Sequence, residues 1–67
     1  MNATYIETSN NTRWYALSGT DTGTGVEFDG EEFGMHEGGY LVDSESRPLV
    51  EGDAVWTAVN RAISGAQ

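Results

Sequence analysis

The chain contains no cysteine and no lysine, and only one proline and one histidine occur among its 67 residues. Disulfides and thiolate zinc sites are therefore excluded, so a single compact domain over residues 1–67 has to rely on apolar packing. No apolar run approaches the roughly 20 residues that a membrane-spanning helix needs. The first residues, MNATYIET, lack the basic start and apolar segment of a secretory signal. We therefore expect a cytoplasmic protein.

Positive charge is also scarce, because three arginines stand against eleven acidic residues and the net charge is −8. Such a surface repels phosphates and anionic lipids, so we expect no direct binding to nucleic acid or membranes. It attracts a basic protein surface instead. The acidity also fits two simpler causes: acidic surfaces favour solubility, and an excess of acid without lysine is compatible with a protein from a high-salt cytoplasm.

Seven of the acidic residues fall in one stretch, EFDGEEFGMHEGGYLVDSE, which holds no arginine or lysine. On a strand, residues two apart lie on one face at roughly 6.6 Å, close to the spacing of phosphates along a nucleic-acid strand. Glu27 and Asp29 have this spacing, as do Asp43 and Glu45. The stretch therefore predicts an acidic surface that can imitate a phosphate backbone. The candidate partner-binding residues are Glu27, Asp29, Glu31, Glu32, Glu37, Asp43 and Glu45.

The N-terminal third predicts a β-hairpin. The segments ATYIET and TRWYALS are rich in β-branched and aromatic residues, and the asparagines between them tolerate positive φ. A two-residue turn at residues 10 and 11 pairs Ile6 with Tyr15 and Glu7 with Trp14. A slip by one residue would change every partner, so the register stays open.

A second hairpin is predicted at Asp29-Gly30, a dipeptide typical of two-residue turns. This turn places Glu27 directly opposite Glu32, which destabilises a ladder by a few tenths of a kcal/mol. The charges either block edge-to-edge aggregation or serve a basic partner, and both interpretations stay open. The turn also puts four apolar side chains on one core face: Val26, Phe28, Phe33 and Met35.

The C-terminal segment predicts one helix. Asp53 suits the N-cap, residues 54–64 have acceptable helix propensity, and Gly65 suits the position after the last turn. Val55, Val59 and Ile63 form an apolar stripe. With a short strand over residues 40–43, the predicted class is α+β: a small antiparallel sheet of about four to five short strands, followed by one C-terminal helix packed on one face.

No catalytic, metal or cofactor motif survives inspection. The glycine-rich segment SGTDTGTG reads as a flexible turn, and it lacks the lysine of a phosphate-binding loop. His36 with Glu32 and Glu37 falls short of the three or four convergent ligands that zinc prefers. We therefore expect a protein that is not an enzyme and holds no cofactor.

In size, acidity, absence of cysteine and α+β pattern, the chain resembles the small phage- or mobile-element-encoded inhibitors of host defence, anti-CRISPR proteins among them. The resemblance implies a non-enzymatic inhibitor, a monomer or homodimer, that blocks a basic nucleic-acid-binding effector by charge mimicry or by steric contact. For steric contact we expect an exposed patch of Trp14, Tyr15 and Tyr40 with neighbouring acids. The alternative is a halophile-type housekeeping protein whose acidity is adaptation to salt.

Overall fold

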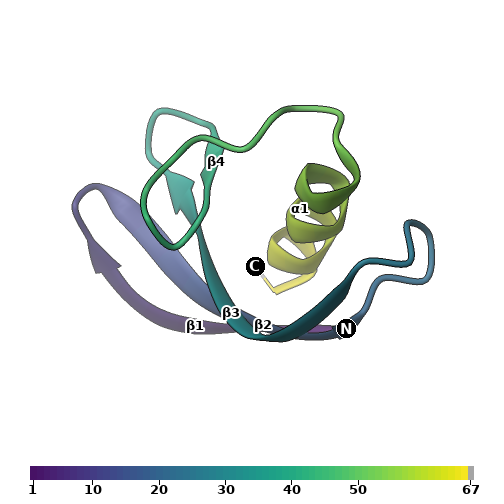
Figure 1. Cartoon of the computed structure of the whole chain (residues 1–67). Helices are drawn as coiled ribbons and strands as arrows, with labels where there is room; N and C mark the ends of the chain where they lie inside the picture. Colours follow the sequence, from purple (N-terminus) through teal and green to yellow (C-terminus); the bar gives the residue numbers. More distant parts are fainter. Residues whose placement is uncertain (67) are drawn as a thin grey trace.

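The structure, a computed structural model that describes residues 1–66, consists of a four-stranded antiparallel sheet with one helix on one of its faces (Figure 1). The strands lie side by side in chain order, and the helix follows the last of them. This confirms the predicted α+β class. The elements are β1 (Asn2–Ser9), β2 (Thr12–Thr20), β3 (Glu27–His36), β4 (Leu41–Val42) and α1 (Ala54–Ala66).

The first hairpin forms at the predicted turn. Asn10 and Asn11 have φ of 54° and 59°, the positive values that a two-residue turn between strands requires. Glu7 lies opposite Trp14 as predicted. The predicted pairing of Ile6 with Tyr15 is wrong, because Tyr5 takes that place and Ile6 is the extra residue of a β-bulge.

The predicted hairpin at Asp29-Gly30 is wrong, because β3 runs straight through this dipeptide. Ser18 of β2 lies opposite Asp29 and Leu17 opposite Glu31, so Gly30 is the extra residue of a second bulge. Its φ of 84° is one that glycine adopts at little cost. An Asp-Gly pair therefore fits a bulge as well as a turn, and pairing along the whole of β2 favours the bulge.

The two glutamates that were expected to face each other across this turn do not meet. Glu27 lies opposite Thr20 and Glu32 lies opposite Ala16, both on β2. No like-charge pair therefore destabilises this ladder.

The apolar face of β3 is nevertheless the predicted one. Phe28 and Phe33 are five positions apart, which in a regular strand would put them on opposite faces, and the bulge returns both to the same side of the sheet. Their rings meet edge to face with centroids 5.5 Å apart. The main core consists of Tyr15, Leu17, Phe28, Phe33, Leu41, Ala58, Val59, Ala62 and Ile63.

Helix α1 starts where the sequence predicts and runs further. The N–H of Thr57 donates to the carbonyl of Asp53 at 2.9 Å, the first helical bond. The predicted end at Gly65 is wrong, since the helix continues to Ala66. The predicted stripe is confirmed at Val59 and Ile63, which are buried against the sheet.

Candidate acidic interface on the outer sheet face

Three of the predicted acids form a line on the sheet face that points away from α1. Glu27, Asp29 and Glu32 are all exposed on β3. Their neighbours on β2 are small and uncharged: Thr20, Ser18 and Ala16. We call Glu27, Asp29 and Glu32 the acidic row.

The Gly30 bulge is what keeps the acidic row on one face. Asp29 and Glu32 are three residues apart, and in a regular strand they would point to opposite sides. Because β3 carries one extra residue, the partners of Asp29 and Glu32 on β2 are only two residues apart. Both acids therefore share the outer face. Glu27 and Asp29 have the regular strand spacing of roughly 6.6 Å. Within residues 1–66, no arginine forms an ion pair with the row.

The other four predicted acids lie elsewhere. Glu31 accepts the backbone N–H of Asp29 and so closes the bulge. Glu37 stands in the turn after β3, where its N–H donates to the carbonyl of Asn11. The structure therefore divides the predicted acidic surface into the row and several separate groups.

Asp43 and Glu45 belong to a turn, and the strand spacing assumed for them is wrong because β4 ends at Val42. The Asp43 carboxylate accepts the backbone N–H groups of Glu45 and Arg47 at 2.9 and 3.0 Å. Glu45 forms an ion pair with Arg47 at 2.8 Å. Both acids stabilise their own turn, and Glu45 is partly neutralised.

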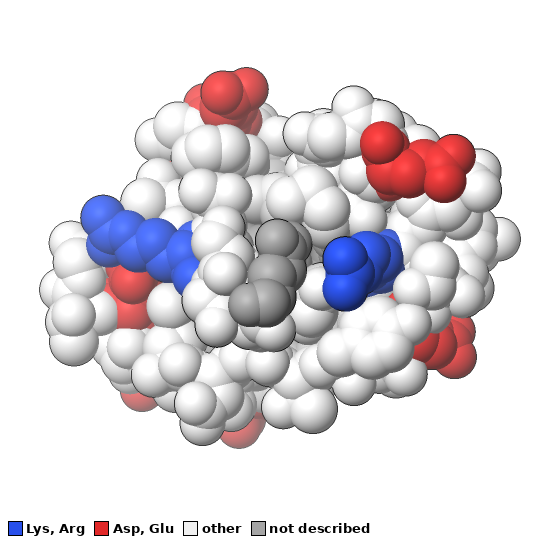
Figure 2. Space-filling view, turned by 180° about the vertical axis from the view of Figure 1, so that it is seen from behind, with Lys and Arg blue, Asp and Glu red and all other residues white. Residues whose placement is uncertain are grey.

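Figure 2 shows how charge is distributed on the side of the molecule opposite to that seen in Figure 1. Acidic side chains stand apart along the margin of this view, and one basic side chain lies directly against an acidic one. The described surface between them is mostly uncharged, apart from a second basic side chain. On this side the acids do not merge into one patch.

One acid that sequence reasoning missed is buried. Asp21, between β2 and β3, is only 5% exposed. Its carboxylate accepts the hydroxyl of Thr24 at 2.6 Å and the backbone N–H of Thr24 at 2.9 Å, and Arg61 of α1 donates to it at 3.2 Å. The aspartate-to-threonine spacing of three, as in a side-chain-stabilised turn, was the available sequence signal.

These contacts control the ionisation of Asp21. The hydrogen bond from the Thr24 hydroxyl is the largest influence and lowers the pKa of this carboxyl below its ordinary value of 3.8. Burial opposes the shift, while the Thr24 N–H and the charge of Arg61 add to it. The segment read as a flexible turn is thus anchored to the helix by an ionised aspartate.

The expected aromatic patch is wrong for two of its three members. Trp14 is 8% exposed and Tyr15 is 1% exposed, so neither is available to a partner. Trp14 lies on the outer face beside Gly34, where the methyl group of Thr12 and the Trp14 ring leave no space for a larger side chain. Tyr40 is exposed and stacks on His36, with ring centroids 4.6 Å apart.

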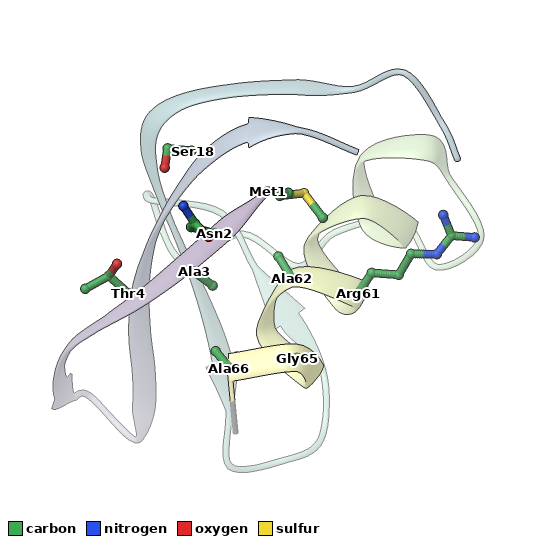
Figure 3. Close-up of a pocket in the computed structure, with 9 residues that line it drawn as sticks. All are labelled: Met1, Asn2, Ala3, Thr4, Ser18, Arg61, Ala62, Gly65 and Ala66. Carbon is green, nitrogen blue, oxygen red and sulfur yellow. The ribbon is translucent and has the colours of Figure 1, made fainter. Parts of the chain in front are cut away.

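A cavity of about 420 Å³ lies between β1 and the second half of α1 (Figure 3). Ala3, Ala62 and Ala66 face this space, whereas the Arg61 side chain points away from it (Figure 3). Arg61 is already engaged with Asp21. The lining also contains three polar uncharged residues, Asn2, Thr4 and Ser18, but no histidine, aspartate or glutamate.

Residues 1–66 contain no group of three or more histidine, aspartate or glutamate side chains arranged to hold a metal ion. In the same part of the chain, no helix is both long and apolar enough to cross a membrane. Comparison of the chain with protein-family models, curated proteins and solved structures finds no match in any of the three.

Proposed function

We propose that this chain is a small non-enzymatic binding protein that blocks a basic nucleic-acid-binding surface of a host defence protein in the cytoplasm. The acidic row is the contact surface. The observation that carries the proposal is the exposure of Glu27, Asp29 and Glu32 on one open sheet face with no arginine paired to them among residues 1–66.

The chemistry of the outer face supports a charged docking surface. Carboxylates at strand spacing present negative charge at intervals close to those of a phosphate backbone. Their neighbours on β2 are small, so a lysine or arginine of a partner can reach the row without a steric barrier. The net charge of −8 adds long-range attraction, which acts within a Debye length of about 8 Å at physiological ionic strength.

The test asks whether binding depends on where the acidic residues lie or only on the net charge. One variant carries Glu27→Gln, Asp29→Asn and Glu32→Gln in the acidic row. Its control has the same net charge and removes three acids outside the row: Glu37→Gln, Glu45→Gln and Glu51→Gln. Both variants and the wild-type chain are used to capture proteins from a host lysate at low and high salt, with and without excess duplex DNA.

We expect a captured protein that is displaced by DNA and that binds the control variant as it binds the wild-type chain. The row variant should bind it at least about tenfold more weakly and with a shallower dependence on salt. Equal weakening by both variants would show that net charge alone drives capture. Unchanged binding of the row variant would refute the proposal.

The alternative function is that of a housekeeping protein adapted to high salt. It is favoured by the scatter of Glu37, Asp43 and Glu45 over turns away from the row. Circular dichroism during a KCl titration distinguishes the two. Folding that appears only in molar KCl supports salt adaptation, whereas complete folding in dilute buffer excludes it.

A further inference from the structure

A second surface lies on the helix-facing side of the sheet, at the turn end of the β1–β2 hairpin, which extends beyond α1 (Figure 1). Thr8, Arg13 and Met35 are cross-strand neighbours there, on three successive strands. Arg13 and Met35 lie two residues from the core pair Tyr15 and Phe33, so they point to the same side of the sheet. Thr8, Arg13 and Met35 therefore continue the core face of the sheet beyond the area that α1 covers (Figure 1).

A pocket of about 270 Å³ opens at this place. Met35 supplies an apolar wall that packs against the core. An apolar cavity of about 150 Å³ is enough to hold benzene, so this pocket has room for one aromatic ring and a short chain. The residues that line it are Thr8, Asn11, Arg13, Met35, His36 and Glu37.

Arg13 differs from the other two arginines. Arg47 and Arg61 each pair with a carboxylate, whereas Arg13 has no carboxylate within 4.0 Å among residues 1–66. Its guanidinium lies over the ring of Tyr5, 5.9 Å from the ring centroid, and the Tyr5 hydroxyl lies 2.7 Å from the hydroxyl of Thr8. The cation–π contact favours a guanidinium held at the pocket with donors still free.

We propose that this pocket binds a small amphipathic carboxylate. The apolar body of the ligand occupies the space beside Met35, and its carboxylate pairs with the guanidinium of Arg13, which can donate two parallel hydrogen bonds. A phosphate ester fits less well, because one arginine is the only cation in the lining, Glu37 is part of it, and the chain carries a net charge of −8. This site is separate from the acidic row and does not depend on the function proposed above.

The test uses the full chain, labelled with ¹⁵N, and two probes of the same shape. 3-Phenylpropionate carries the carboxylate, and 3-phenylpropanamide is its neutral analogue. We expect the carboxylate to shift the amide signals of Thr8, Met35 and His36 with a Kd on the order of 1 to 10 mM, as suits a ligand of this size. The amide should bind about tenfold more weakly, because it lacks the charge-assisted hydrogen bonds to Arg13.

Two arginine variants test whether the preference for the carboxylate probe comes from Arg13. Arg13→Gln should bind the two probes equally, and Arg47→Gln, which removes an exposed arginine outside the lining, should retain the wild-type preference. The proposal is overturned if both probes bind the wild-type chain equally, if Arg13→Gln keeps the preference, or if the shifted signals lie outside this pocket.

Discussion

Asp21 and the acidic row contain the same chemical group in opposite surroundings. The Asp21 carboxylate is buried and accepts hydrogen bonds from Thr24 and Arg61, whereas the row lies exposed on the outer face without an arginine partner in residues 1–66. A carboxylate of the first kind stabilises the fold. Carboxylates of the second kind contribute little to stability, so they are available for contact with another molecule.

Replacing Asp21 with alanine should give the largest loss of stability among the single carboxylate substitutions. The variant leaves the N–H and hydroxyl of Thr24 and the guanidinium of Arg61 without their acceptor. Urea unfolding followed by tryptophan fluorescence measures the change, and Glu27→Ala in the acidic row is the control. Equal midpoints for the two variants would contradict the contrast between the two regions.

The same contrast predicts a dependence on pH. The folded pKa of Asp21 lies below its ordinary value of 3.8, so its ionised form favours the folded state. This stabilisation is complete above the unfolded pKa, about 4, and is lost as the pH falls through the lowered folded pKa. Urea midpoints of the wild-type chain and Asp21→Asn should differ at pH 7 and converge towards pH 2. A constant difference would show that the charge of Asp21 is not involved.

A smaller decrease is expected for Gly23→Ala, which leaves Asp21 intact. A methyl group at this position would overlap Nη1 of Arg61, so the guanidinium has to move away. The free energy of unfolding should fall by about 0.5 to 1 kcal/mol, the range of a partly exposed ion pair. Gly25→Ala is an unsuitable control because φ is 79° there, so Gly65→Ala, in open space within α1, serves instead. A drop in stability only for Gly65→Ala would refute the packing argument.

The smallest effect on stability is expected in the acidic row. Each of Glu27→Gln, Asp29→Asn and Glu32→Gln should change the free energy of unfolding by no more than about 0.5 kcal/mol, because the side chains are exposed. Thermal unfolding at pH 7 checks this. A loss as large as that of Asp21→Ala would mean that the row has a structural role.

The parts of the fold that follow from local signals were predictable. The start of α1 and the turn at Asn10 and Asn11 depend on residues that are neighbours in the chain. The face shared by Phe28 and Phe33 was also predicted, although for the wrong reason. The Asp-Gly signal at position 30 is ambiguous, because it fits both a turn and a bulge. The bulge forms because β2 is long enough to pair along the whole of β3.

The site was predictable only in part. The sequence indicated an acidic stretch, but the division into the row and the turn acids depends on where the strands end. Asp21 escaped notice because Arg61 is 40 residues away in the chain. The burial of Trp14 depends in the same way on contact with another strand, where Gly34 leaves space for its ring.

The extra residue at Gly30 also sets what kinds of sequence change β3 can absorb. Removing this one position would give a regular strand in which Phe28 and Asp29 keep their partners on β2 and their faces. Loss of the bulge at unchanged length would instead turn the residues on one side of it over, so that Phe28 would leave the core as Asp29 entered it. Substitutions along the exposed side involve no such exchange. A lineage carrying this fold should therefore keep a residue that tolerates positive φ at position 30, or lose that position, while the exposed side of β3 varies.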